Sequence, residues 1–211
     1  MSSSLYAELE SHIPTGSPRV IIGVAGAPGA GKSTFVERFA AHLGSRAVVL
    51  PMDGFHLSSA QLSRLGRAER KGAPDTFDVD GYVCLLDRIR RANAPVFAPR
   101  FDRHLEESIA ADIVIETGVP VVLTEGNYLL HDEHGWERVH GLLDATWWVD
   151  IDDETRRQRL IDRHVRYGRS LVDARAWVTR SDEANARALA GGRNRADVVI
   201  EDDERYVLNS R

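Results

Sequence analysis

Short runs of apolar, β-branched residues recur along this chain, separated by stretches long enough for helices. They lie at residues 19–25, 47–50, 119–124, 145–151 and 197–200. Uninterrupted runs of this length are typical of strands covered on both faces of a parallel sheet. Because strands alternate with helical stretches, the pattern predicts an α/β sandwich whose parallel strands are joined by right-handed crossovers.

Apolar residues at helical spacing fill two of the intervals. One predicted helix covers residues 34–43, directly after a glycine-rich turn. A second covers residues 79–92, where Val83, Leu86 and Ile89 share one face. This spacing is typical of amphipathic helices that pack on a sheet.

Three further segments carry other patterns. Residues 152–190 predict two helices that break near Gly168, and their many arginines suit a mobile lid. Residues 66–80 and 94–104 are rich in Gly, Pro, Asp and Arg, and we expect both to be irregular. Loops of this length in a compact domain are usually either functional or disordered.

Length and composition are those of one domain. The 211 residues predict a single domain, residues 1–211, with the lid at about 152–190. No apolar run approaches the roughly 20 residues of a membrane span. The first residues lack the basic and apolar regions of a secretory signal. We therefore expect a cytoplasmic protein without membrane insertion.

Charge and rare residues narrow the classes of partner. The net charge of −5 argues against a nucleic-acid surface, which is normally basic, and favours a small-molecule partner. The sequence leaves open whether the chain also forms a homodimer. Of 27 basic residues only Lys32 and Lys71 are lysines, which suggests a specific role for each compact ammonium group. The single cysteine, Cys84, has apolar neighbours, and we expect it to be buried.

The residues from Gly26 to Ser33 match the phosphate-binding pattern G-x-x-x-x-G-K-[ST] in full, between a predicted strand and a predicted helix. Glycine backbones and a helix N-terminus supply the N–H donors that phosphate oxygens need. Lys32 would reach the β and γ phosphates, and Ser33 would bind Mg²⁺. We expect ATP with Mg²⁺ to be bound by Gly26, Ala27, Pro28, Gly29, Ala30, Gly31, Lys32, Ser33 and Thr34, and by Arg159 from the lid.

Two acids follow predicted strands at the edge where open α/β sheets bind ligands. Asp53 could accept the proton of an attacking hydroxyl or hold the water shell of a metal. Glu125 resembles a Walker-B-type acid near Mg²⁺, so that Ser33 and Glu125 form the expected metal site. The alternative is that each carboxylate only caps a turn or a helix.

Two loops, residues 71–78 and 99–104, are candidates for binding a phosphoryl acceptor, although exposed loop faces would explain the same residues. Together with Asp53, the expected acceptor-binding residues are His56, Lys71, Phe77, Arg100, Arg103 and Tyr128. Three other histidines, His131, His134 and His140, lack a convincing zinc spacing, and we predict no metal site there.

Arginines of the lid could close over a transferring phosphoryl group. Arg159 and Arg163 are four residues apart and share one helix face, and Arg166 and Arg169 follow. Such side chains can neutralise charge in a transition state. A solvated helix whose arginines pair with nearby acids is the alternative. Of these arginines, we expect Arg163 first and Arg159 second to contact the transferring phosphoryl group.

Six motifs in order resemble the superfamily of uridine kinases, phosphoribulokinases and type I pantothenate kinases. Within it, the chain is most similar to bacterial proteins labelled fructose transport-system kinases or nucleoside kinase-like proteins. The motifs cover nearly the whole chain, from residue 22 to about 200, and are the P-loop, Met52–Leu57, Arg70–Asp78, Pro99–Arg103, Glu125–Leu130 and Asn185–Ala188.

The resemblance implies a three-layer P-loop NTPase sandwich, with a mainly parallel five-stranded sheet and a helical lid. It also implies phosphoryl transfer from ATP to an alcohol, with Asp53 as general base, Glu125 near the metal and Arg163 near the phosphates. Arg103 stands where pantothenate kinases have a histidine, which weakens pantothenate specificity. Ser181 and Asp182 stand where related chains have Asn-Asp, so no role is carried over to them.

The expected function is therefore an ATP-dependent kinase in which Lys32, Asp53, Glu125 and Arg163 are catalytic. A sugar such as fructose, or a nucleoside, is the favoured acceptor. The alternatives are a pantothenate-type vitamin kinase and a catalytically silent ATP-binding regulator, which would be expected to lose Asp53 or Glu125. A GTPase would usually contain an Asn-Lys-x-Asp element, which neither lysine forms.

Overall fold

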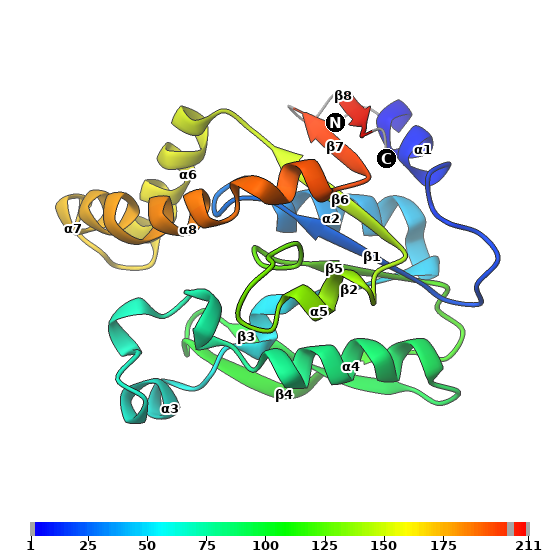
Figure 1. Cartoon of the computed structure of the whole chain (residues 1–211), viewed down its shortest axis with the longest axis horizontal. Coiled ribbons are helices and arrows are strands. Elements are labelled where there is room, and N and C mark those ends of the chain that lie inside the picture. Colours follow the sequence, from blue (N-terminus) through cyan, green and yellow to red (C-terminus); the bar gives the residue numbers. More distant parts are fainter. Residues whose placement is uncertain (1–2, 202–204, 210–211) are drawn as a thin grey trace.

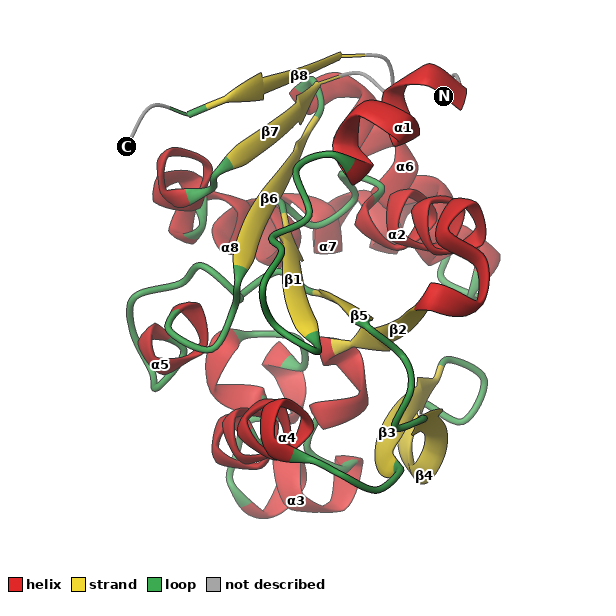
Figure 2. Cartoon of the chain, turned by 90° about the vertical axis from the view of Figure 1, so that its right-hand side faces the viewer, coloured by secondary structure: helices red, strands yellow, loops and turns green. Residues whose placement is uncertain are grey.

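The computed structural model describes residues 3–201 and 205–209, and these build three layers around a central sheet (Figures 1 and 2). The sheet has six strands in the order β2-β5-β1-β6-β7-β8. The strands are β1 (Val20–Ala25), β2 (Ala47–Pro51), β5 (Val121–Glu125), β6 (Ala145–Asp150), β7 (Val198–Glu201) and β8 (Arg205–Leu208). The five apolar runs thus form the five parallel strands, as predicted.

The sixth strand, β8, was not predicted. It pairs antiparallel with β7 at the edge of the sheet. Its four residues are mostly exposed, so they lack the apolar run by which the buried strands are recognised. The sheet is therefore mainly parallel but has one strand more than expected.

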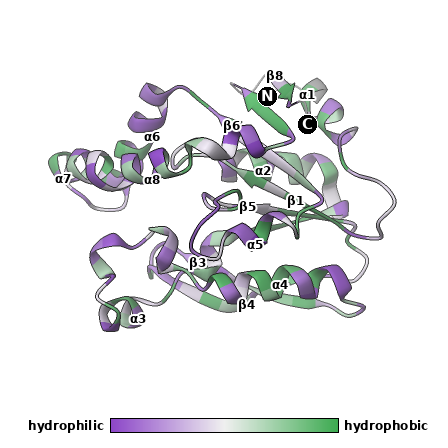
Figure 3. Ribbon diagram, viewed as in Figure 1, coloured by the Kyte–Doolittle hydropathy of each residue, from purple (hydrophilic) through white to green (hydrophobic). Residues whose placement is uncertain are grey.

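Alternate residues of the strands enter two separate hydrophobic cores. On β1, Ile22 and Val24 face the core formed with α1 (Ser3–Glu10) and α2 (Lys32–Leu43). Ile21 faces the opposite core, which is formed with α4 (Val79–Arg91) and α5 (Glu137–His140). Figure 3 shows hydrophobic colours along β7 and hydrophilic colours along α6 (Asp153–Arg166).

The predicted helix at residues 79–92 forms as α4, but one expectation about it was wrong. Cys84 is exposed, whereas Leu85, Leu86 and Ile89 are buried. An apolar neighbourhood in sequence does not bury a helical residue, because only one face of the helix meets the sheet.

Residues 94–104 are not irregular, which corrects another expectation. They contain β3 (Val96–Asp102), which pairs antiparallel with β4 (Glu107–Ile115) as a separate two-stranded sheet. Pro99 lies at a shift of register between Ala98 and Arg100. Proline is tolerated at such bulges and on edge strands. Because proline more often marks a loop, the sequence pattern around Pro99 did not predict this strand.

The segment after β6 forms two helical arms, as predicted. They are α6, and then α7 (Leu171–Trp177) with a π-helical turn (Val178–Asp182) and α8 (Glu183–Ala188). The break is at Gly168, whose φ of 96° is in the left-handed region that favours glycine. Figure 1 shows these helices beyond one end of the sheet, with α3 (Ser59–Arg64) on the other side of the same end.

The remaining described elements are short. Residues 66–78 are irregular, as expected, apart from two turns of 3₁₀-helix, whereas residues 79 and 80 already belong to α4. The 3₁₀ turns are Gly44–Arg46, Met52–Phe55, Ala68–Arg70, Pro74–Thr76 and Ala190–Arg195. Of the helices that the structure describes, none is long and apolar enough to cross a membrane.

Candidate active site

The glycine-rich loop joins the end of β1 to the start of α2, the context in which this motif binds phosphates. Gly29 and Gly31 have φ angles of 83° and 96°, which other residues rarely adopt. A Cβ on Gly29 would also lie 2.8 Å from the carbonyl oxygen of Arg156. The loop therefore requires glycine where it passes the lid.

Lys32 lies at the base of this loop with only 7% of its surface exposed. Its Nζ donates to the carbonyl oxygen of Ala27 at 3.0 Å and to Oδ1 of Asn127 at 2.7 Å. Burial lowers the pKa of Lys32 to about 8, although Glu125 and Asp53 oppose this shift. A buried ammonium with so few partners would be stabilised by a phosphate.

Ser33 and Glu125 meet beside Lys32. The hydroxyl of Ser33 donates to Oε1 of Glu125 at 3.1 Å, and Glu125 is 7% exposed at the end of β5. Burial and the nearby Asp53 raise the pKa of Glu125 to about 6. This crowding of carboxylates favours a cation, and hydroxyl and carboxylate oxygens are ligands that suit Mg²⁺. The donor set therefore fits the expected metal.

Asp53 lies in the 3₁₀ turn that follows β2, and its Oδ2 accepts a hydrogen bond from Nη2 of Arg103 at 2.7 Å. Burial alone would raise the pKa of Asp53, but its neighbours His56, Arg103 and Lys32 hold that pKa below its ordinary value. Asp53 is thus a carboxylate at neutral pH, which can accept a proton from a hydroxyl.

His56 is held between two aromatic rings. Its ring centroid is 4.1 Å from that of Phe77 and 4.7 Å from that of Phe101. Burial lowers the pKa of His56, and its Nδ1 lies 2.8 Å from the carbonyl oxygen of Asp53. In the neutral ring, Nδ1–H donates to that carbonyl, which leaves Nε2 as a hydrogen-bond acceptor.

The lid contributes the opposite wall. Arg159 and Arg163 from α6, and Tyr167 directly after it, line the pocket. Nε2 of His164 lies 2.8 Å from Oδ2 of the buried Asp182. Burial and the neighbouring Arg103 lower the pKa of Arg163. Cations therefore face the pocket from both sides.

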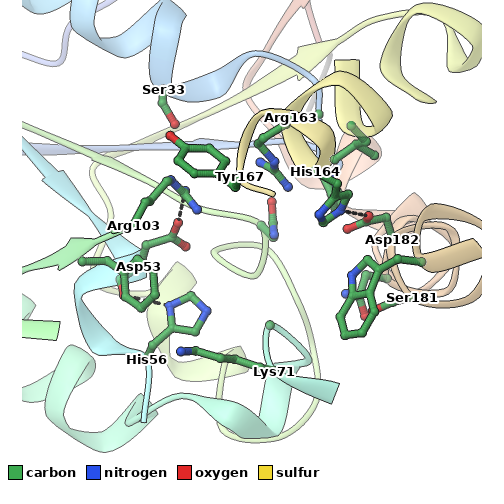
Figure 4. Close-up of a pocket in the computed structure, with 18 of the residues that line it drawn as sticks. Ser33, Asp53, His56, Lys71, Arg103, Arg163, His164, Tyr167, Ser181 and Asp182 are labelled. Carbon is green, nitrogen blue, oxygen red and sulfur yellow. Dashed lines mark hydrogen bonds and ion pairs between the residues drawn. The ribbon is translucent and has the colours of Figure 1, made fainter. Parts of the chain in front are cut away.

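These groups line one pocket of about 790 Å³. Figure 4 shows Asp53, His56, Lys71 and Arg103 on one side, with His164 and Asp182 on the other. The expected site residues that the pocket brings together are Pro28, Gly29, Gly31, Lys32, Ser33, Thr34, Asp53, His56, Lys71, Phe77, Arg103, Glu125, Arg159 and Arg163.

Two expected acceptor-binding residues do not reach the pocket. Tyr128 is fully buried, and its hydroxyl donates to the carbonyl oxygen of Gly72 at 2.6 Å. Arg100 points from β3 to Asp112 of β4. The resemblance placed both residues in motifs, but a motif also contains residues that only support its loop.

Sequence reasoning missed several residues that the structure connects to the site, and two of them contact the P-loop directly. Asn127 accepts from Lys32, and its position two residues after Glu125 was the available signal. Arg156 is 2% exposed and contacts Glu183, Asp153 and the carbonyl oxygen of Pro28. It thus ties α6 to α8 and to the P-loop, which no local pattern indicates.

A group of three residues lies outside this pocket. The ligand atoms of His131, Glu133 and His134 lie within 4.8 Å of one another, with Glu133 and His134 exposed. The expectation that no metal is bound here stays a prediction.

Comparisons with known proteins agree with this geometry. The family model described as "Phosphoribulokinase / Uridine kinase family" matches residues 21–205. A putative uridine kinase from Schizosaccharomyces pombe is 31% identical over 199 residues, covering 87% of this chain and 83% of that protein.

Solved structures show the same relationship. The crystal structure of a putative fructose transport system kinase from Silicibacter sp. TM1040 is 34% identical, with a TM-score of 0.83 over 90% of this chain and 95% of that chain. A putative P-loop kinase from Saccharomyces cerevisiae, 18% identical with a TM-score of 0.78, covers 95% of this chain and 98% of its own and shares the fold. The chain belongs to the phosphoribulokinase/uridine kinase family of P-loop kinases.

Proposed function

We propose that this protein is an ATP-dependent kinase that transfers the γ-phosphoryl group to a hydroxyl of a small metabolite. A sugar such as fructose, or a nucleoside, is the acceptor that the names of its relatives suggest first. The observation that carries the proposal is that Lys32 of the P-loop and the carboxylate of Asp53 line one pocket. A phosphate donor and an acceptor hydroxyl can therefore meet there.

In the proposed reaction, the acceptor hydroxyl gives its proton to Asp53 while its oxygen forms a bond to the γ-phosphorus. The bond from that phosphorus to the β–γ bridging oxygen breaks, and ADP leaves. Lys32 and Arg163 would balance the charge on the phosphates. A bound Mg²⁺, held by Ser33 and Glu125, would supply further neutralisation of that charge.

A silent ATP-binding regulator is the alternative that the geometry favours less. Such a protein does not need a base and a metal-binding acid in one pocket, yet both Asp53 and Glu125 line it here. A pantothenate-type kinase is an alternative acceptor class within the same chemistry, and the assay below includes it.

The test is ADP release with ATP and Mg²⁺ in the presence of sugars, nucleosides, pantothenate and related vitamins. We expect at least one acceptor to raise ADP release above the rate without acceptor, and Lys32→Ala to abolish that increase. The matched control, Arg91→Ala, removes an exposed cation outside the pocket and should keep the wild-type rate. Measurable ATP binding without turnover of any acceptor would favour the regulator instead.

A further inference from the structure

The pocket has the opposite charge to the protein as a whole. The chain carries a formal net charge of −5. Its pocket is lined by seven basic side chains and four acidic ones. The basic residues are Lys32, Lys71, Arg103, Arg159, Arg163, Arg166 and Arg169, and the acidic ones are Asp53, Glu106, Glu125 and Asp182. Such a concentration of one sign in a cleft attracts ligands of the other sign.

A magnesium nucleotide would account for part of this charge, but not for Lys71. Figure 4 shows Lys71 beside His56, on the same side of the pocket as Asp53. Arg103, the other cation on this side, already donates to Asp53 at 2.7 Å. Lys71 therefore differs from Arg103 in that it does not pair with Asp53, the expected base.

The loop that carries Lys71 is held in place from the core. Tyr128 donates to the carbonyl oxygen of Gly72 at 2.6 Å, and Nε1 of Trp136 donates to that of Pro74 at 3.0 Å. Both aromatic side chains are fully buried. A buried frame of this kind fixes the backbone from which the Lys71 side chain extends, as a binding site requires.

The partners of Lys71 within the protein leave its charge weakly matched. Nζ donates to the backbone carbonyl oxygen of Glu106 and lies 3.6 Å from the carboxylate of the same residue. It also lies 5.2 Å from the ring centroid of Phe101, a contact that supplies no formal charge. That carboxylate side chain is 58% exposed, whereas the side chain of Lys71 is 19% exposed. An ion pair with an exposed partner contributes little, so an anion in the pocket would compete well for the ammonium group.

We propose that the phosphoryl acceptor is itself an anion, a hydroxylated carboxylate or phosphate ester whose negative group binds Lys71 while its hydroxyl faces Asp53. This inference rests on the proposed function and narrows its acceptor class. A neutral sugar or nucleoside would leave the ammonium group with only the exposed carboxylate of Glu106 as its anionic partner. Lys71 is one of only two lysines among the 27 basic residues of the chain. Its ammonium group acts as a point charge, which can bind a carboxylate or a phosphate.

The test compares matched charged and neutral ligands. The protein is saturated with Mg²⁺ and a non-hydrolysable ATP analogue, and binding is measured by calorimetry. The pairs are glycerate with glycerol, gluconate with glucose, and a ribose phosphate with ribose. The first two pairs test a carboxylate, and the third tests a phosphate. We expect one charged member to bind about tenfold or more tightly than its neutral partner.

Variants assign that difference to Lys71. Lys71→Met should remove the preference for the charged ligand, while Lys71→Arg should retain part of it. Arg64→Met, an exposed cation of α3 outside the pocket lining, is the matched control and should bind as the wild type does. Unchanged affinity for the nucleotide analogue in Lys71→Met shows that the pocket remains folded and that Lys71 does not act on the nucleotide.

Three results would overturn the inference: equal binding of the charged and the neutral ligand in all three pairs, no binding of any charged ligand, or equal binding of the preferred charged ligand by the wild type and Lys71→Met. These outcomes are separable from a failure of the kinase proposal. If a neutral acceptor is phosphorylated, the proposed kinase activity is supported and the proposed anionic acceptor is contradicted. If charged ligands bind through Lys71 but nothing is phosphorylated, the anion site is supported and the kinase activity is contradicted.

Discussion

The two sides of the pocket are built in different ways. The nucleotide side consists of a loop and an acid at the ends of neighbouring buried strands, β1 and β5. The acceptor side consists of a turn after β2, the irregular segment at 66–78 and the hairpin of β3 and β4. Strand ends fix the first side, whereas contacts between loops fix the second. Loops can vary without loss of the fold, so the acceptor side is where related kinases can differ.

The largest expected effect tests whether the acceptor side carries the chemistry. Asp53→Asn keeps the shape of the side chain but removes the carboxylate that would accept the proton. We expect kcat to fall by about a thousandfold, with little change in KM for ATP. Steady-state kinetics with an acceptor identified by the assay above measures both constants.

Asp87→Asn is the matched control, because Asp87 pairs with Arg91 on the exposed face of α4, outside the pocket lining. It should behave as the wild type does. A rate for Asp53→Asn close to that of the control would show that Asp53 is not the base.

The next effect concerns the connection between the lid and the nucleotide side. Arg156→Met leaves the mostly buried Glu183 without its main partner, so we expect the free energy of unfolding to fall by about 3 kcal/mol. Urea denaturation measures this change, and hydrogen exchange shows whether α6 and α8 open first.

Its neighbour provides the control. Arg157 also contacts Asp153 and Glu183, but its side chain is 46% exposed. Arg157→Met should change the free energy of unfolding by less than about 1 kcal/mol. Equal losses in the two variants would mean that burial of Arg156 is not what anchors the lid.

A third change separates function from stability on the nucleotide side. Burial lowers the pKa of Lys32 to about 8 from its ordinary 10.5, so the charged form is disfavoured in the folded protein. Lys32→Met should therefore raise the stability of the nucleotide-free protein at neutral pH by up to roughly 3 kcal/mol while abolishing ATP binding.

The pH dependence gives the sign of this effect. Between the folded pKa of about 8 and the unfolded value of 10.5, the unfolded chain holds the extra proton. The contribution of Lys32 to wild-type stability therefore rises with pH through this window, and the variant should lack that rise. Arg38→Met, an exposed change on α2, should keep it. Thermal unfolding over this pH range measures the difference, and a rise of equal size in Lys32→Met would contradict the assignment.

The smallest effect tests a contact that joins the P-loop to the end of β5. Asn127→Ala removes the oxygen that accepts from Lys32, and we expect kcat/KM for ATP to fall about tenfold. Asn127→Asp, which keeps an accepting oxygen, should lose less, and the exposed Asn93→Ala should lose nothing. An equal loss in the alanine and aspartate variants would indicate a role for the amide NH₂ group instead.

Local patterns were sufficient wherever a property belongs to neighbouring residues. Five apolar runs predicted the five parallel strands, and the glycine-lysine motif predicted the turn between β1 and α2. The break between α6 and α7 followed from Gly168. In each case burial on both faces, or a backbone angle that favours glycine, restricts which residue types can occupy the positions concerned.

Properties that depend on distant residues required the tertiary structure. Asp53 and Arg103 are 50 positions apart and meet only because β3 pairs with β4 beside the turn after β2. The exposure of Cys84 and the full burial of Tyr128 likewise depend on which side of an element meets the core. The sequence by itself determined the family, the five parallel strands and the nucleotide loop. Only the tertiary structure decided which side chains line the pocket beside Asp53, because long-range packing places them.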